Sequence, residues 1–348
     1  MSIIKTCTFS PNASDHRLLR TLTPAQIPAL FSGRSIVQKE YQDTFLLIRR
    51  TYRDGSEDFR LLAQIDLEDY SFHVGTGHPI RAAECFSAIE EETPVETLPL
   101  LFLDDCEKLI IESIARHIRE YDLVFSVKRD SVLVEGFALP PHAARLVEEK
   151  IDALSDPAVF KEKYATDSDA PLVLAVGRDG NLSSAKREWE KLKISHHDRL
   201  SQHESERFVT VEIQNIYSPH VSFAPIHRLY QGEDTAALMD FFPHAAPSVF
   251  LQDHGQDITL FCPEGAHTFR VNTHFPLVSM TAGILSRFVA AHGGRVVPIR
   301  GKSMLRALSA AEGQVGILLP PPTKQTFFPG IIQDGILPSD SFIIEEHE

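Results

Sequence analysis

The sequence lacks the features that mark several large classes of protein. Its first residues, MSIIKTCTFSPNASDH, contain no apolar stretch like that of a signal peptide. No uninterrupted apolar run approaches the roughly 20 residues that a membrane helix needs. No Cys-x-x-Cys pair occurs among the four cysteines, which argues against a disulfide framework or a structural zinc site: Cys7, Cys85, Cys106 and Cys262. We therefore expect a cytoplasmic protein with no membrane partner.

Positive charge is also scarce. The 34 lysines and arginines are outnumbered by 48 aspartates and glutamates, so the net charge is 34 − 48 = −14. A surface this acidic repels a phosphate backbone, and no dense Lys/Arg cluster offsets it. We therefore expect no nucleic-acid partner and predict a small-molecule ligand, while the oligomeric state stays open.

Several catalytic motifs are missing as well. The chain has no Gly-x-Ser-x-Gly, no His-Glu-x-x-His, no P-loop and no Gly-x-Gly-x-x-Gly, and it has no internal repeat. His196, His197 and His203 are close in sequence, but adjacent histidines point apart on a helix or strand. We therefore expect no metal site there.

What remains is the pattern of a mixed α/β protein. Strand-like runs at 44–52 and 59–67 are joined by Asp54-Gly55, a hairpin signal. The 43% of hydrophobic residues suffices for a core. We predict an α/β fold with mixed sheets, flanking helices and two lobes around a central strand-turn-helix. The polar run 160–170 favours halves at 1–165 and 166–348, although one continuous domain stays an alternative.

That central strand-turn-helix is PLVLAVGRDGNLSSAKREWEKLK, residues 171–193. A buried strand stops at Gly177, a tight turn follows at 179–181, and Ser183 and Ser184 open a helix. The unpaired N–H groups and partial positive charge of a helix N-terminus suit phosphate or carboxylate. The alternative is an ordinary strand-to-helix turn.

Other charged residues are candidates for the same site. Arg81 and Glu84 are three apart, so a phosphate-binding guanidinium could neighbour a base; the alternative is a structural ion pair. His227-Arg228 combines a proton carrier with an anion binder; the alternative is a structural role, which is usual for such a pair in a loop. Glu212 lies on an alternating strand, where it either serves a pocket or lines a solvated face.

Four segments in order resemble the bacterial family called domain of unknown function 1015, in its clostridial-type branch. Its members carry "DLEDYD…IRATEGT", "LYAVGDGNHSLATAK", "VEIVNIHD…FEPIHR" and "LLP…K…LFP…DGVLPRKTF". This chain has DLEDYSF then IRAAECF, LAVGRDGNLSSAK, VEIQNIYSPHVSFAPIHR, and LLPPPTKQTFFPGIIQDGILPSDSF. The turn is also similar to the signature of ParB-like kinases that phosphorylate free serine. By analogy, the resemblance implies nucleotide and phosphate handling.

The chain departs from the family at positions suited to phosphate or proton transfer. Leu182 follows Asn181 where the family has histidine, and the segment is one residue shorter. Ala83 replaces the threonine of RATEGT, and Cys85-Phe86 replaces its glycine-threonine pair. Ser339-Asp340 replaces the arginine-lysine of the ending. These departures favour a degenerate, non-catalytic member as the alternative to an enzyme.

Residues and resemblance together predict a protein that binds a nucleotide or phosphorylated small molecule, with ATP or ADP and Mg²⁺ as the implied cofactors. Phosphoryl transfer to a small amino or hydroxy acid such as serine is the reaction implied. The predicted catalytic residues are Glu84, His227 and Asp179. The predicted phosphate-binding residues are Arg81, Gly180, Asn181, Ser183, Ser184, Glu212, Arg228 and Lys324.

Overall fold

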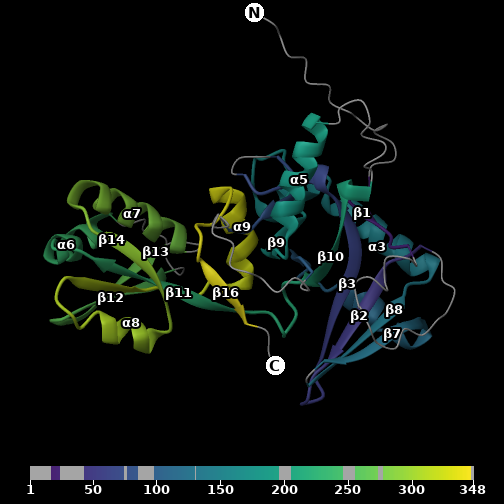
Figure 1. Ribbon diagram of the computed structural model, residues 1–348, viewed down its shortest axis with the longest axis horizontal. Helices are drawn as coiled ribbons and strands as arrows, with labels where there is room; N and C mark the ends of the chain where they lie inside the picture. The colour runs from purple at the N-terminus through teal and green to yellow at the C-terminus, as the bar shows by residue number, and fades with distance from the viewer. Residues whose placement is uncertain are drawn as a thin grey trace, which may run out of the picture.

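The computed structural model describes residues 17–23, 43–73, 77–84, 98–129, 131–195, 205–245, 255–272 and 277–345. Over these ranges the chain forms two sheets and eight α-helices, which confirms the expected mixed α/β class. Figure 1 shows two lobes, with the C-terminal segment between them. Within the described ranges, no helix is long and apolar enough to cross a membrane.

The first sheet has ten strands in the order β4-β5-β9-β6-β10-β3-β2-β8-β7, and β1 pairs with β3. β4, β5 and β9 run parallel to one another, and β6 is antiparallel to β9 but parallel to β10. From β10 to β7 every pairing is antiparallel. The strands are β1 Leu19–Arg20, β2 Leu46–Thr51, β3 Glu57–Asp66, β4 Tyr70–Ser71, β5 Ile80–Ala82, β6 Leu100–Leu103, β7 Asp122–Arg129, β8 Val132–Ala138, β9 Leu174–Arg178 and β10 Phe208–Asn215.

Among the described residues, helices cover both faces of this sheet around its central strands β6 and β9. One face carries α2 (Ile111–Ala115), α3 (Pro141–Leu154) and α5 (Leu182–Ser195), whose apolar side chains share one core with β3, β6, β9 and β10. The other face carries α4 (Pro157–Tyr164) and α9 (Lys324–Asp334), which pack with β6 and the C-terminal strand. Short 3-10 turns lie at Leu67–Asp69 and Ile118–Glu120. Because both faces are covered, charged groups in the middle of the sheet must be paired.

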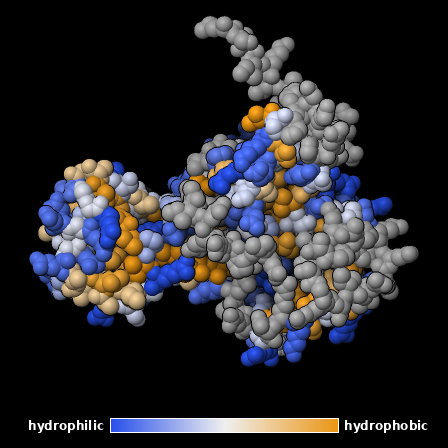
Figure 2. All heavy atoms as spheres, viewed as in Figure 1, coloured by the Kyte–Doolittle hydropathy of each residue, from blue (hydrophilic) through white to orange (hydrophobic). Residues whose placement is uncertain are grey.

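The second sheet is antiparallel, in the order β13-β12-β15-β11-β14, and β16 also pairs with β11. Helices α6 and α7 share a core on one face, and α8 packs on the other. Figure 2 shows hydrophobic residues of this lobe reaching the surface beside hydrophilic ones. The elements are β11 Ser222–Gln231, α6 Thr235–Ala245, β12 Gly255–Cys262, β13 Gly265–Asn272, α7 Leu277–His292, β14 Arg295–Arg300, α8 Lys302–Leu308, β15 Gln314–Leu318 and β16 Phe342–Glu345.

The sequence prediction succeeds for local hairpins and fails for one long strand. The strands around Asp54-Gly55 pair in antiparallel register as expected. His227 and Arg228, expected in a loop, lie instead on β11, which pairs with β14, β15 and β16. Pro225 lowers the strand propensity of this segment, and only its distant partners reveal the strand. The halves 1–165 and 166–348 stay a prediction; the change from one sheet to the other occurs between β10 and β11.

A bulge distorts β9 beside β6, where the register shifts between Leu100 and Leu101. As a result Arg178, rather than Gly177, pairs with Leu100. A β-carbon on Gly177 would lie 2.3 Å from Cε2 of Phe102. Glycine is therefore required here by the close approach of an aromatic ring.

Gly177→Ala should lower the free energy of unfolding by about 1–3 kcal/mol, because Phe102 must move inside a packed core. Gly283→Ala on α7 is the matched control, since no atom lies within 4 Å of its added β-carbon. It should be neutral or stabilising by up to about 1 kcal/mol. Urea unfolding followed by circular dichroism measures both, and equal effects would contradict the packing described for Gly177.

Candidate functional site

Two predicted catalytic carboxylates lie at the same edge of the first sheet. β5 and β9 are parallel and adjacent, so their carboxyl ends meet. Glu84 follows β5, and Asp179 follows β9. Ligands of α/β proteins commonly bind outside the carboxyl ends of parallel strands, so this edge is a candidate site.

The turn at the start of α5 is closed by its own aspartate. The Asp179 carboxylate accepts hydrogen bonds from the Ser183 backbone N–H at 2.9 Å and from Ser183 Oγ at 2.8 Å. Gly180 and Asn181 adopt left-handed φ values of 49° and 76° to make the turn. A phosphate at Ser183 would have to displace this carboxylate. Burial raises the pKa of Asp179 above its ordinary value, although the Ser183 bonds oppose the shift.

The position that aligns with the missing histidine is part of the core. Leu182 is fully buried and packs in the same cluster as Trp189. Ser184, two residues along α5, is half-buried. A histidine at 182 would therefore place its imidazole among apolar side chains rather than beside a ligand.

Arg81 ties the loop before β5 to the segment before β9. Its Nε donates to the carbonyl of His78 at 2.8 Å, and Nη2 donates to the carbonyl of Ala170 at 2.7 Å. Burial lowers the pKa of Arg81. Its neighbour three residues on, Glu84, makes a different set of contacts.

Glu84 joins the first sheet to the C-terminal segment. Its Oε2 accepts a hydrogen bond from the backbone N–H of Ser341 at 2.9 Å. One residue earlier, the carbonyl of Ala83 accepts from Leu337 N–H at 2.9 Å. On β11, Arg228 reaches the same segment, where Nη2 donates to the carbonyl of Ser339 at 3.2 Å. We call Glu84, Arg228, Ser339, Asp340 and Ser341 the Glu84 junction.

The electrostatics of this junction favour a neutral glutamic acid. Burial raises the pKa of Glu84 to about 7, and the charge of Asp340 adds to the rise. The Ser341 bond and the Arg228 charge act in the opposite direction. A carboxyl group that titrates near neutral pH is suited to proton transfer, and such groups cluster at functional sites.

The hydrogen bonds of His227 and Lys324 go to residues outside the Glu84 junction. Because His227 and Arg228 are adjacent on a strand, their side chains point to opposite faces of the sheet. His227 Nδ1 accepts a hydrogen bond from Leu319 N–H at 3.2 Å, and burial lowers the pKa of His227. Lys324 Nζ donates to the carbonyl of Ser218 at 2.6 Å.

Glu212 is buried rather than solvated. It forms ion pairs with Arg50 at 2.6 Å and Arg60 at 2.7 Å. Although burial opposes ionisation, the charges of the two arginines lower the pKa of Glu212 to about 2. Sequence reasoning missed both arginines. The available signal was a charged residue, Arg60, directly before the apolar run Leu61-Leu62-Ala63.

The four segments that carry the family resemblance contact one another. Lys186 Nζ, at the end of the LAVGRDGNLSSAK segment, donates to the carbonyl of Leu67 in the DLEDYSF segment at 2.8 Å. Tyr70 of the same segment lies near Asp179, whose charge adds to burial in raising the pKa of the phenol. The Glu84–Ser341 and Lys324–Ser218 contacts join the remaining segments. The motifs thus meet in space, although they are far apart in sequence.

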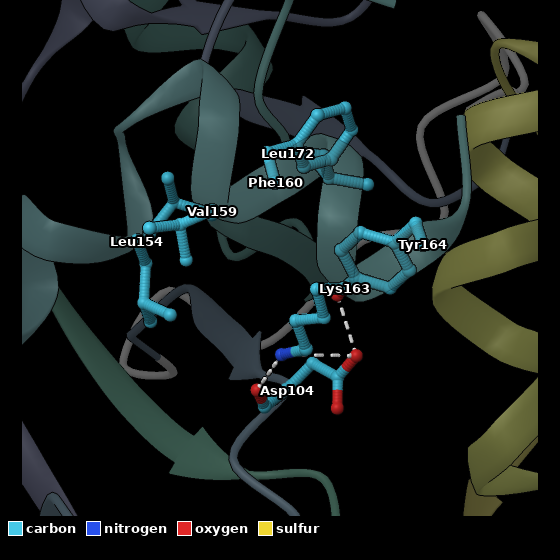
Figure 3. A pocket seen from close by; sticks show the side chains of 8 residues that line it. Asp104, Leu154, Val159, Phe160, Lys163, Tyr164 and Leu172 are labelled. Atoms are coloured by element: carbon cyan, nitrogen blue, oxygen red, sulfur yellow. Dashed lines mark hydrogen bonds and ion pairs between the residues drawn. The ribbon is translucent and has the colours of Figure 1, made fainter. Parts of the chain in front are cut away.

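A small cavity in the first lobe cannot hold a metabolite. It lies beside α4, with a volume of about 10 Å³, enough for one water molecule. Figure 3 shows Lys163 and Tyr164 pointing toward Asp104 at its rim. The Lys163 Nζ to Asp104 Oδ2 distance is 3.3 Å. This cluster pairs its own charges and leaves no room for a substrate.

Metal ligands do not gather in the described ranges. No group of three or more His, Cys, Asp or Glu side chains there could hold a metal ion. His196, His197 and His203 lie outside the described residues.

No protein-family model matches the chain, and no curated protein matches it at the significance threshold. Among solved structures, it is similar to a mutant free serine kinase in complex with AMP, with 10% identity over 57% of this chain and 81% of that one, at a TM-score of 0.33. A truncated SbnI from Staphylococcus aureus has 11% identity over 66% and 85%, at 0.32. A conserved hypothetical protein from Pyrococcus furiosus has 10% identity over 52% and 72%, at 0.31. Likenesses this distant carry no inference about the ligand.

Glu84→Gln should stabilise the protein at alkaline pH. A folded-state pKa of about 7 against an ordinary value of 4.5 means that ionising Glu84 costs folding free energy. This cost grows as the pH rises from the unfolded-state pKa to the folded-state pKa, and it is complete above the folded-state pKa. The variant should therefore gain about 1–3 kcal/mol at about pH 8 and nothing at about pH 4.

Urea unfolding at both pH values measures the gain. Glu188→Gln, which removes an exposed carboxylate from α5, controls for the loss of one surface charge. If Glu84→Gln raised the free energy of unfolding equally at the two pH values, that result would contradict the raised pKa of Glu84.

Proposed function

We propose that this protein binds a phosphorylated small molecule at the Glu84 junction, as a divergent member of the domain of unknown function 1015 family. ATP and ADP are the ligands to test first. The observation that carries the proposal is a half-buried carboxyl with a pKa of about 7 and a buried arginine that bond to neighbouring residues of the same C-terminal segment, where three motif segments meet.

Arg228 is suited to release its present contacts for a phosphate. Its hydrogen bonds to the carbonyls of Ile226, His227 and Ser339 are 3.2–3.4 Å long. Charge-assisted bonds from a guanidinium to phosphate are shorter and stronger than these. Phosphate binding would therefore exchange these long carbonyl contacts for a bidentate ionic one, although Arg228 already feels the charge of Asp340 and Glu84.

Glu84 suits the same ligand because it is neutral below about pH 7. A protonated carboxyl donates a hydrogen bond to a phosphate oxygen, whereas a carboxylate repels it. The α5 N-terminus contributes less directly, since the Asp179 carboxylate already accepts both Ser183 donors. Glu84 and Arg228 therefore support binding of a phosphate at the Glu84 junction more strongly than phosphoryl transfer at the Asp179 turn.

Phosphoryl transfer to a small amino or hydroxy acid such as serine is the second candidate, favoured by the same pKa. Glu84 would accept the proton of the substrate hydroxyl, while the terminal phosphoryl group moves from ATP to the hydroxyl oxygen and ADP leaves. Mg²⁺ commonly binds through phosphate oxygens and water, so it would arrive with the nucleotide. Roles for Asp179 and His227 in catalysis stay predictions.

Titration calorimetry with ATP, ADP and phosphoserine, each with Mg²⁺, tests binding. At least one ligand should bind with a dissociation constant below millimolar, and Arg228→Ala should weaken it at least about tenfold by removing a charge-assisted bond. Arg287→Ala, an exposed arginine on α7, is the matched control. Absence of heat from all three ligands at millimolar concentration would contradict the proposal.

A phosphotransfer assay separates the two candidates. If the protein transfers phosphate, Glu84→Gln should lower turnover about 100-fold or more while ADP affinity changes little. No turnover in the wild type, combined with retained ADP binding, would remove the enzyme candidate and leave the binding proposal intact.

A further inference from the structure

The second lobe carries a basic surface in a chain that is acidic elsewhere. Between Glu264 and Glu312 the sequence has no aspartate or glutamate, but it has six lysines and arginines. The rest of the chain therefore carries a formal charge of −14 − 6 = −20. Four of the six cations lie on β14 and α8: Arg295, Arg300, Lys302 and Arg306. Such an uneven distribution of charge steers an acidic partner toward one side of a molecule.

Helix α8 turns one side to the sheet and the other side to solvent. Leu305 is fully buried and packs with Leu229 of β11, whereas Lys302 and Arg306 are exposed. These two cations are four residues apart, so they lie on the same side of the helix. Figure 1 shows α8 on the opposite side of the second sheet from α7. The outer side of α8 therefore presents two positive charges to solvent.

The four cations of β14 and α8 have no acidic partners within the described part of the chain. None of them forms an ion pair with a carboxylate there. Arg295 Nε donates to the neutral Gln231 Oε1 at 2.8 Å. Lys302 lies near His227, where its charge helps to lower the pKa of the imidazole. The cations are therefore available to the carboxylates of another molecule.

An apolar side chain belongs to the same surface. Met304, between Lys302 and Arg306 in the sequence, is 57% exposed. Methionine adapts its shape to different apolar partners and is common on surfaces that bind protein segments. We call Met304 and the four cations of β14 and α8 the α8 surface.

Two other occupants fit the α8 surface less well. A second copy that docked through the same surface would bring like charges together, and Pro298 on the edge strand β14 disfavours the addition of another strand. Nucleic acid would be repelled by the −20 charge of the rest of the chain. The α8 surface also has no aromatic side chain on which bases could stack.

We propose that the α8 surface binds a short acidic segment of a partner protein, whose carboxylates pair with Lys302 and Arg306 and whose apolar side chain packs on Met304. Arginine matches the planar, two-oxygen geometry of a carboxylate. Because β11 side chains alternate, His227 and Leu229 point toward α8, whereas Arg228 of the Glu84 junction points to the other face. The inference is therefore independent of the function proposed for that junction.

Fluorescence anisotropy with labelled peptides and the full chain, at low and at physiological ionic strength, tests the proposal. The probes are a blocked glutamate-rich peptide with a central leucine and the same peptide with a central serine. The wild type should bind the leucine peptide about threefold or more tightly than the serine peptide, because only leucine buries apolar area on Met304. Both affinities should fall as salt is added.

Lys302→Ala/Arg306→Ala should weaken both peptides about fivefold or more at low ionic strength, because it removes two charge contacts. Arg116→Ala/Arg119→Ala, which removes two exposed arginines from the first lobe, is the matched control for net charge and should change affinity by less than about twofold.

Met304→Ser should abolish the preference for leucine and leave the affinity for the serine peptide unchanged. All of the substituted side chains are exposed, so the melting temperature of each variant should stay close to that of the wild type.

Absence of binding by both peptides at low ionic strength overturns the proposal, as does equal weakening by the α8 pair and the control pair. A wild type that binds the two peptides equally overturns the contact with Met304. Tighter binding to a short DNA duplex or to phosphatidylserine vesicles than to the leucine peptide, at physiological ionic strength, also overturns the proposal, because it assigns the surface to another class of polyanion.

Discussion

The pairing of Glu212 with Arg50 and Arg60 is the constraint on which the first sheet depends. Glu212 on β10 is only 5% exposed, so water cannot solvate its carboxylate well. Its two arginines come from β2 and β3, and the three strands are therefore fixed in relative register by charge as well as by backbone hydrogen bonds. Removing one partner would leave an unpaired buried charge, which is among the costliest changes a core can suffer.

The C-terminal segment connects this sheet to the second one. α9 and β16 lie between the lobes in Figure 1, and β16 extends the pairing of β11. The same segment supplies Ser341 to Glu84 and Ser339 to Arg228. The groups best suited to proton and phosphate chemistry therefore lie where elements from the middle and the end of the chain converge.

Local patterns predicted more than long-range ones. The Asp54-Gly55 hairpin and the strand-turn-helix at 174–195 follow from turn residues and periodicity, so they could be predicted directly. β11 could not, because its proline and charged residues become a strand only when three partners pair with it. Glu84 could be selected from its motif, but its raised pKa depends on burial by distant residues. Asp179 was predicted to be catalytic; that its carboxylate closes the turn by accepting two hydrogen bonds from Ser183 could not be read from the motif.

The pKa of Glu84, measured by carbon-13 NMR of its side-chain carboxyl with and without ADP, tests the central claim most directly. The account predicts a midpoint of about 7 in the free protein. ADP should shift the midpoint upward, because a bound phosphate disfavours a second negative charge nearby. A midpoint near the ordinary value of 4.5, or one that ADP leaves unmoved at saturation, would contradict it.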